Sequence, residues 1–390
     1  MRFPEFTEEW ERTQLNHYLE ENKERNKRGL FNKNDVLSVS GDFGIVNQIE
    51  LLGRSFAGKR VLDYHIVRSG NIVYTKSPLK EYPYGIVKIN KGVDGIVSTL
   101  YAVYNVKENA DGRFIEFYFE LPNRINRYFK PIVRIGAKHD MKIGNDEVLA
   151  NNVVFPCLAE QMRISNLITL LNKRIATQNK IIQQLQSLIK GIVVEHYNKT
   201  HKTKVKIKDL GKSYSVMNMS KEDLSETGNE CIIYGELFTT YGCVATDIVS
   251  RTEKSIQSSI ISTGYDLLFP ASTTVDAQSL IAPTAISQPN IILGGDMFGI
   301  AVKQDYNNEY LSYVFNYVYK NYLASYAQGS TIIHLHYNDI KNLEIELPDI
   351  NTQNELVLLL HNMQDKVFTE KKMLSMYETQ KAYLLRNLFI

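Results

Sequence analysis

The chain has 390 residues and a formal net charge of +2. A chain of this length is too long to fold around one ordinary hydrophobic core, which predicts two domains or more. A hydrophobic fraction of 44%, with 24 Tyr and 16 Phe, excludes a disordered tail. The three cysteines show no CxxC spacing, which argues against a disulfide framework or a zinc site.

The sequence offers no membrane or export signal. No eighteen apolar residues run together, and the opening MRFPEFTEEWERTQ lacks the apolar segment of a signal peptide. We therefore expect a cytoplasmic protein with no membrane partner. A net charge of +2 is small for a nucleic-acid binder, so any basic surface has to be local.

The first third of the chain alternates short strands with turns. Strands are predicted in GNIVYT, YGIVKI and GIVSTLYAVYNV, between residues 70 and 106, because β-branched and aromatic residues are bounded there by turn residues. Apolar residues then recur at helical spacing at Phe114, Phe117, Tyr118 and Leu121, and Pro122 stops that pattern.

A long heptad seam follows the first strand-rich part. Apolar positions recur there at alternating spacings of four and three residues, which is typical of a coiled coil. The seam comprises Ile164, Ile168, Leu171, Ile175, Gln178, Ile182, Leu185, Ile189 and Ile192. A seam of this length needs a partner helix.

The second half of the chain repeats this order of elements. Strands are predicted in NIILGG and NLEIELP, and a helix is predicted from Leu311 to Tyr322. A second seam follows, with one lapse at Lys381. It comprises Leu356, Leu360, Met363, Val367, Glu370, Leu374, Tyr377, Lys381 and Leu384.

The two halves align as two copies of one unit. IGNDEVLANNVVFP lies on LHYNDIKNLEIELP without a gap, at a shift of 192 residues that places Pro156 on Pro348. Upstream the shift drifts to 194 for VRSGNIVYTKS on ISTGYDLLFPAS, and to 196 for RFIEFYFE on EYLSYVFN, as loops of different length require. Each copy is a strand-rich domain followed by a long helix.

We therefore predict an α+β fold with a pseudo-twofold internal repeat. Two similar mixed α/β domains, at 1–156 and 198–349, would be separated by two long antiparallel coiled-coil helices, at 157–197 and 350–390. Antiparallel pairing would set Gln178 against Glu370, a polar layer that fixes register. The seam 164–192 would span about 42 Å, comparable with the roughly 34–36 Å between DNA contacts one helical turn apart. A helical pair used only for dimerisation is the alternative.

Three segments resemble the specificity subunits of type I restriction-modification systems. They are the opening MRFPEFTEEWERTQL, the central FPCLAEQMRISNLITLLNKRIATQNKIIQQLQSLIKGI and the tail LPDINTQNELVLLLHNMQDKV. The resemblance covers nearly the whole chain. Within the two domains, however, only the layout of the segments is similar, and not the residues themselves. The resemblance implies two target recognition domains, each reading one half of a split, asymmetric DNA site, with the spacer helices setting the gap.

The resemblance also implies partners. In this family the spacer helices bind two modification subunits, which methylate adenine N6 with S-adenosylmethionine, and ATP-dependent restriction subunits join to translocate and cut double-stranded DNA. This chain would then hold no catalytic residue, metal or cofactor, because S-adenosylmethionine, ATP and magnesium would belong to the partners. The second helix is less regular, which leaves open whether both helices contribute equally to docking. The residues expected at the spacer interface are Ile164, Ile168, Leu171, Ile175, Gln178, Ile182, Leu185, Leu356, Leu360, Met363, Val367, Glu370 and Leu374.

The residues themselves also favour a non-catalytic role. The adenine methyltransferase signature, Asn or Asp followed by Pro-Pro and an aromatic residue, does not occur. The segment GRSFAGKR is close to the P-loop motif, but Arg60 occupies the position of the Ser or Thr whose hydroxyl would bind magnesium. His334 and His336 would share a strand face and could bind a metal. No third ligand is evident, which favours hydrogen bonding or DNA contact for both.

Polar loops that flank the strands supply the candidate DNA contacts. Base edges are read by Arg, Lys, Asn, Gln, Ser or Thr, and phosphates by cations and hydroxyls. The candidates in the first domain are Lys76, Ser77, Lys80, Tyr82, Tyr84, Arg134, Lys138 and Lys142. Those in the second are Ser272, Thr273, Thr274, Tyr326, Gln328, Ser330, Thr331 and His334. The loops around Lys138 and Ser330 are favoured, and ordinary surface polarity is the alternative for each residue.

Two other functions remain open. One is a DNA-binding regulator or assembly scaffold with the same duplicated layout, which salt-dependent binding to a split site would discriminate. The other is an enzyme with an unrecognised nuclease or methyltransferase centre. In that case the isolated chain would act on DNA and lose its activity when the acidic residues near Asp349 are changed.

Overall fold

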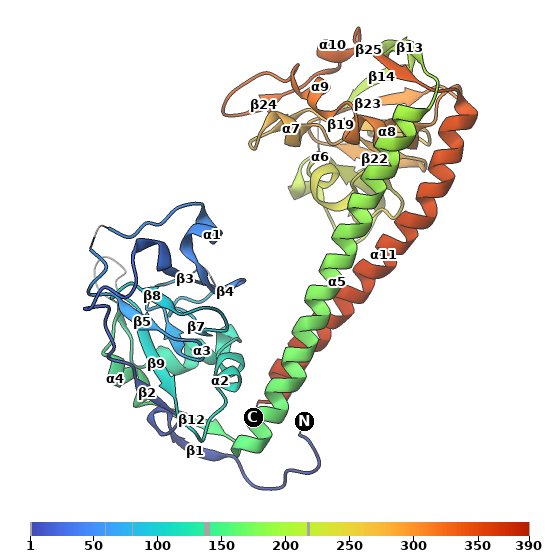
Figure 1. Cartoon of the computed structure of the whole chain (residues 1–390). Coiled ribbons are helices and arrows are strands. Elements are labelled where there is room, and N and C mark those ends of the chain that lie inside the picture. The colour runs from blue at the N-terminus through green and yellow to red at the C-terminus, as the bar shows by residue number, and fades with distance from the viewer. Residues whose placement is uncertain (1, 59, 80, 136–140, 217–218, 390) are drawn as a thin grey trace. The chain divides into compact units, whose positions relative to one another are not determined.

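The structure is a computed structural model that describes residues 2–58, 60–79, 81–135, 141–216 and 219–389. The chain forms two compact units. Unit 1 is residues 1–178 with 373–390, and unit 2 is residues 179–372. Both units mix helices with sheets, as the sequence predicts (Figure 1). No helix in the described ranges combines the length and the apolar character needed to cross a bilayer.

Unit 1 is built on a four-stranded antiparallel sheet in the order β2-β9-β6-β7. The strands are β2 (Leu19–Glu21), β6 (Ile72–Tyr74), β7 (Val87–Ile89) and β9 (Ala102–Val106), three of which the sequence predicts. Helices α2 (Gly112–Tyr118) and α3 (Pro122–Phe129) pack on this sheet, where Tyr74 stacks on Phe129 with ring centroids 4.3 Å apart. The first predicted helix ends at Tyr118, before the predicted position Leu121, which caps the next helix, α3. Pro122 begins α3, where its missing N–H costs nothing because a helix leaves its first N–H groups unpaired.

Short two-stranded ribbons surround the sheet of unit 1. They pair β1 (Glu11–Gln14) with β12 (Asn152–Phe155), β3 (Leu37–Ser40) with β4 (Gly44–Asn47), β5 (His65–Val67) with β8 (Gly95–Val97), and β10 (Arg134–Ile135) with β11 (Met141–Lys142). Two short helices, α1 (Gln48–Leu52) and α4 (Asn145–Leu149), complete the unit.

His65 in β5 is expected to make the stability of unit 1 depend on pH. The residue is 1% exposed, and among the described residues its Nδ1 has no hydrogen-bond partner. Burial, helped by repulsion from Arg25 and Lys76, lowers the pKa of His65 to about 4. The unfolded chain takes up this proton below about pH 6.5, whereas the folded chain does so only near pH 4. The contribution to stability is therefore complete above pH 6.5 and is lost as the pH falls toward 4.

We expect this group to lower the free energy of unfolding by on the order of 2 kcal/mol between about pH 7 and about pH 4. Urea denaturation at the two pH values measures the difference. His65→Gln should make the difference smaller, and His17→Gln, which changes an exposed histidine of the same unit, should leave it as in the wild type. Equal pH dependence of the wild type and His65→Gln would contradict this role for His65.

Unit 2 contains an equivalent antiparallel sheet, extended by one parallel strand, in the order β14-β23-β19-β21-β16. These strands are β14 (Gly211–Val216), β16 (Val244–Ala245), β19 (Asp266–Pro270), β21 (Thr284–Ile286) and β23 (Met297–Val302). A second sheet has the order β17-β15-β22-β18, formed by β15 (Asn229–Ile233), β17 (Ser250–Thr252), β18 (Ile261–Thr263) and β22 (Pro289–Gly294). Unit 2 also contains β13 (Thr203–Lys206), β20 (Ser272–Thr273), β24 (Ile333–His334), β25 (Glu344–Leu347), α6 (Tyr234–Glu236), α7 (Ala277–Leu280) and α10 (Tyr337–Ile340).

The helix predicted from Leu311 to Tyr322 is interrupted. The structure has α8 (Asn308–Tyr317) and α9 (Lys320–Ala324). The backbone leaves helical geometry at Tyr319, whose hydroxyl accepts a hydrogen bond from the Glu346 N–H at 2.7 Å and pairs with the Tyr197 hydroxyl at 2.6 Å. The apolar spacing continues across the break, so the pattern alone could not show it.

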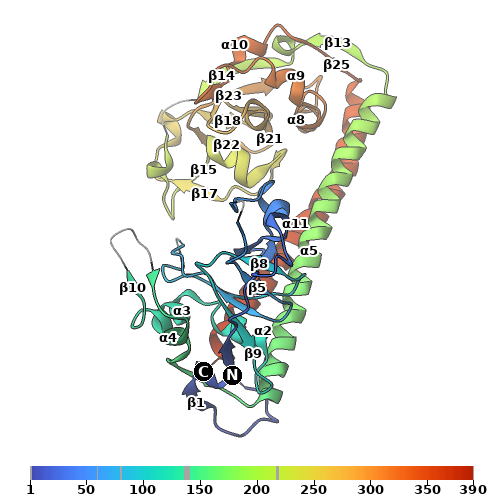
Figure 2. The same cartoon turned by 60° about the vertical axis from the view of Figure 1, so that its left-hand side comes forward.

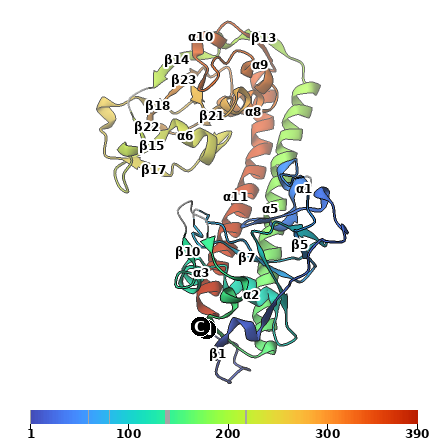
Figure 3. The ribbon, with the colours of Figure 1, turned by 90° about the vertical axis from the view of Figure 1, so that its left-hand side faces the viewer.

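The two predicted long helices are α5 (Leu158–Lys199) and α11 (Ile350–Asn387). They run antiparallel in unit 1, where Ile164 shares a core with Leu384 and the Arg174 guanidinium lies 5.9 Å from the centre of the Tyr377 ring. In unit 1 the end of α11 also lies beside α3 (Figure 3). Arg124 of α3 donates there to the carbonyl oxygens of Leu385 in α11 and of Phe389 just after it.

Every residue that the sequence predicts for the two seams is buried or half-buried. Gln178 and Glu370 are 5% and 6% exposed, and Lys366 forms an ion pair with Glu370 at 2.5 Å. Gln178 belongs to unit 1 and Glu370 to unit 2, so their mutual pairing stays a prediction.

The internal repeat is visible in the registers of the two units. Glu11 opposes Phe155 where β1 pairs with β12, and Thr203 opposes Leu347 where β13 pairs with β25, so both strands are shifted by the predicted 192 residues. The strand orders β2-β9-β6-β7 and β14-β23-β19-β21 are also equivalent. The two units are therefore two versions of one fold.

Two buried glutamines join each long helix to its unit in the same way. Gln161 and Gln353 are fully buried, and each donates to the carbonyl oxygen of the proline before its helix, at 2.9 and 2.8 Å. Each also accepts from the N–H of the residue that caps α2 or α8, which is Asp111 at 3.0 Å and Asn307 at 2.9 Å. A buried amide bonded on both sides holds the helix at a defined angle to the domain.

Candidate nucleic-acid interface

Unit 2 presents a small ribbon formed by three backbone segments. β20 pairs antiparallel with β24, so that Ser272 lies opposite His334. Gln328 pairs with His334 on its other side, through N–H to carbonyl bonds of 2.8 and 2.7 Å. Gly329 makes the turn possible, because its φ is +111° and a Cβ would stand 2.1 Å from the carbonyl oxygen of Ile332. We call residues 272–273 and 328–334 the unit 2 ribbon.

The unit 2 ribbon holds side chains that are free to bind a ligand. Gln328, Ser330 and Thr331 are exposed, and His334 is half-buried. Among the described residues, none of these four side chains has a hydrogen-bond partner. Thr274 is exposed nearby, and Ser272, Thr273 and Tyr326 are half-buried. The structure thus brings most of the residues predicted for the second domain together, and their contact with DNA stays a prediction.

Unit 1 carries an equivalent but different ribbon. β10 pairs with β11, so that Arg134 lies opposite Lys142, and both residues are exposed. Figure 2 shows β10 at the periphery of unit 1. By the shift of 192 residues, Lys142 corresponds to His334 of the unit 2 ribbon. Two exposed cations at this edge suit phosphate or guanine contact.

The other candidates of the first domain are placed differently. Lys76 is half-buried and donates to the carbonyl oxygen of Ile143 at 2.9 Å, and burial lowers the pKa of its ammonium group. The Tyr82 hydroxyl donates to the carbonyl oxygen of Glu120 at 2.9 Å, and Tyr84 packs against the core. These side chains already have internal partners, so DNA contact by them stays a prediction. Ser77 is half-buried, and Lys80 and Lys138 lie outside the described residues.

A hollow of about 490 Å³ adjoins the unit 2 ribbon. It is lined by Asp296, Gln328, Gly329, His334, His336 and Asp339. A second hollow, of about 480 Å³, shares Asp296 and His336 with the first and continues along β14. Sequence reasoning missed Asp296, because a single acidic residue in a glycine turn carries no distinctive signal.

The hollow is suited to hydrogen bonding. The rings of His334 and His336 stack with centroids 6.0 Å apart. The Asp339 carboxylate caps α10 by accepting from the His336 N–H at 2.8 Å. Over the described part of the chain, no three His, Cys, Asp or Glu side chains come together in a way that could hold a metal ion.

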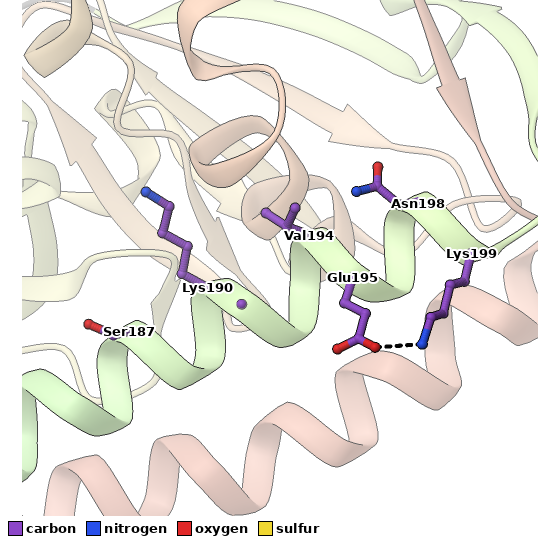
Figure 4. A pocket seen from close by; sticks show the side chains of 7 residues that line it. Ser187, Lys190, Val194, Glu195, Asn198 and Lys199 are labelled. Carbon is purple, nitrogen blue, oxygen red and sulfur yellow. Dashed lines mark hydrogen bonds and ion pairs between the residues drawn. The ribbon is translucent and has the colours of Figure 1, made fainter.

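A separate hollow of about 480 Å³ follows the exposed face of α5 in unit 2 (Figure 4). It is lined by Ser187, Lys190, Gly191, Val194, Glu195, Asn198 and Lys199. Gly191 leaves open space, since a Cβ there would meet nothing within 4 Å. Leu188 is 53% exposed on the same helix. An open helix face with exposed apolar side chains can receive a side chain from another protein.

The comparisons with known proteins agree with this architecture. Residues 199–375 match the family model of the type I restriction modification DNA specificity domain. A comparison with curated proteins finds no match. The S subunit of a type I restriction-modification system from M. genitalium is 12% identical, with a TM-score of 0.59, over 98% of this chain and 96% of that chain. A chain from a structure on complex assembly and conformational transition of the type I R-M system is 13% identical, with a TM-score of 0.54, over 97% of both chains. These likenesses establish the fold, and the family match confirms, over residues 199–375, the resemblance predicted from the sequence.

Proposed function

We propose that this chain is the sequence-reading subunit of a type I restriction-modification complex, because its residues 199–375 match the family model of the type I restriction modification DNA specificity domain. Each unit would read one half of a split, asymmetric site on double-stranded DNA. The observation that carries this proposal is the duplicated frame: two units of one fold, each with a ribbon just before its last strand. Because the ribbons carry different side chains, the two half-sites would differ.

The chemistry would be performed by other subunits. Two modification subunits would dock on the spacer helices, where the open face of α5 around Gly191 supports such contact. They would transfer the methyl group of S-adenosylmethionine to adenine N6, and restriction subunits would use ATP and magnesium. This chain would act as a non-catalytic subunit in the cytoplasm.

Single-molecule methylation sequencing tests this function. DNA is compared between cells that express the chain with its neighbouring modification gene and cells that lack only this chain. We expect N6-methyladenine at a motif of two short halves, with a fixed gap of unspecified bases, in the first cells alone. Identical methylation in both would contradict the proposal and favour a scaffold of the same layout.

A further inference from the structure

We propose that Asp296 makes the hollow beside the unit 2 ribbon a reader of one amino-bearing base, cytosine or adenine, in the major groove. This inference rests on the proposed function. Beyond that function, it specifies which class of base is read at one position of one half-site. Gln328 and His334 would contact the same base or its neighbour.

Asp296 is held in a rigid turn between β22 and β23. Gly295 has φ +91°, and a Cβ there would stand 2.6 Å from the ring of Tyr234, so only glycine fits the turn. The Met297 N–H donates to the carbonyl oxygen of Gly295 at 3.0 Å. The carboxylate therefore projects from a fixed backbone, which is what base discrimination requires.

The turn and the unit 2 ribbon are tied to a single residue. The Ala271 N–H donates to the carbonyl oxygen of Asp296 at 2.8 Å, and the Ala271 carbonyl oxygen accepts from the Leu335 N–H at 3.0 Å. Ala271 itself is 4% exposed. Asp296 and the segment from His334 to His336 thus keep a fixed spacing, and both line the same hollow.

The charge of Asp296 selects the ligand. Its side chain is exposed, and among the described residues it forms no hydrogen bond or ion pair. An unpaired carboxylate is repelled by DNA phosphates, so it would weaken binding unless it accepts a hydrogen bond from a base. In the major groove only cytosine N4 and adenine N6 donate, whereas guanine and thymine present acceptors. Asp296 would therefore favour cytosine or adenine and oppose guanine or thymine.

The neighbours of Asp296 fit the same ligand. The backbone of Gln328 is used by the ribbon, but its exposed side-chain amide has no partner among the described residues. Such an amide can pair with adenine N6 and N7. His334 offers one ring nitrogen as donor and one as acceptor when neutral. Asp339 is less available as a second reader, because its carboxylate already caps α10.

Asp296→Asn tests the inference, since it keeps the shape of the side chain while the new amide can donate to guanine or thymine. Methylation sequencing is run on cells that express the variant or the wild type with the modification gene. We expect one position in one half-site to change from cytosine or adenine alone to acceptance of guanine or thymine. The preference should fall roughly tenfold, and the other half-site should be unchanged. Asp305→Asn removes another exposed carboxylate of unit 2, one outside the hollow, and should keep the wild-type motif.

The outcomes separate this inference from the proposed function. If the wild-type chain directs no split-site methylation, the proposed function itself fails. If the wild type methylates a split site and Asp296→Asn keeps the same motif, or changes both halves, the inference about Asp296 is overturned. Where methylation by the variant is too weak to read, the purified complex is tested by competition binding with duplexes carrying each of the four bases at each position. Unchanged preference in that assay also overturns it.

Discussion

An aspartate in place of Ile168 is expected to unfold unit 1 and to abolish methylation directed by this chain. Ile168 lies on α5, is fully buried, and belongs to the core that also contains Leu171 and Leu384. A charge in this apolar core has no partner, so we expect a loss of about 4 kcal/mol or more in the free energy of unfolding. Urea denaturation followed by circular dichroism measures this loss.

Leu170→Asp is the matched control for Ile168→Asp. It places the same residue in the same helix two positions away, where the leucine is 62% exposed. The helix propensity costs of the two substitutions differ by only a few tenths of a kcal/mol, slightly to the disadvantage of Leu170→Asp, so burial is the main difference between the variants. Leu170→Asp should unfold close to the wild-type urea midpoint. A wild-type midpoint for Ile168→Asp would show that the seam is not buried as described.

The long helices and the internal repeat could be predicted because both leave a regular spacing of apolar residues in the sequence. Heptad spacing predicts α5 and α11, since a buried stripe on a long helix must recur every three or four residues. The constant shift of 192 residues predicts the equivalent ribbons β1·β12 and β13·β25. Core packing repeats in both units, and so the apolar pattern repeats in the sequence.

The candidate site could be predicted only in part, because binding surfaces have no periodicity. Lys76 and Tyr82 have the polar character of DNA contacts, but their side chains reach back into unit 1, a path set by tertiary packing. Asp296 enters its hollow only because Ala271 brings its turn against β24, from residues distant in sequence. Likewise Tyr319 breaks a regular helical pattern through its hydroxyl contacts with α5 and β25.

The two units share one fold, but their ribbons carry different side chains, and this combination supports a DNA site whose two halves differ in sequence. Gln161 and Gln353 make the same hydrogen bonds in the two units. At the equivalent ribbon position, however, unit 1 has the cation Lys142 and unit 2 has His334. Cations suit guanine or phosphate, whereas the hollow of unit 2 is lined by Asp296, Asp339, Gln328 and two histidines. A repeated frame that carries different side chains in its two copies fits an asymmetric target.

Gly211→Ala is expected to disrupt the five-stranded sheet of unit 2 and with it one half of the recognition. A Cβ at Gly211 would stand 2.0 Å from the carbonyl oxygen of Ala301 and 2.8 Å from its carbonyl carbon, both in the backbone of β23. Backbone cannot move aside without breaking the β14·β23 ladder, so we expect a loss of about 3 kcal/mol or more in the free energy of unfolding. Urea denaturation of the full chain measures it.

Loss of the β14·β23 ladder would also remove one wall of the hollow that β14 and Asp296 line together. Methylation of the split site should therefore fall with stability, although unit 1 keeps its own core. Gly235→Ala is the control, because a Cβ at Gly235 meets nothing within 4 Å. It should keep wild-type stability and methylation. A Gly211→Ala protein as stable as Gly235→Ala would mean that β14 approaches β23 less closely than the structure places it, and the hollow along β14 would then need a different wall.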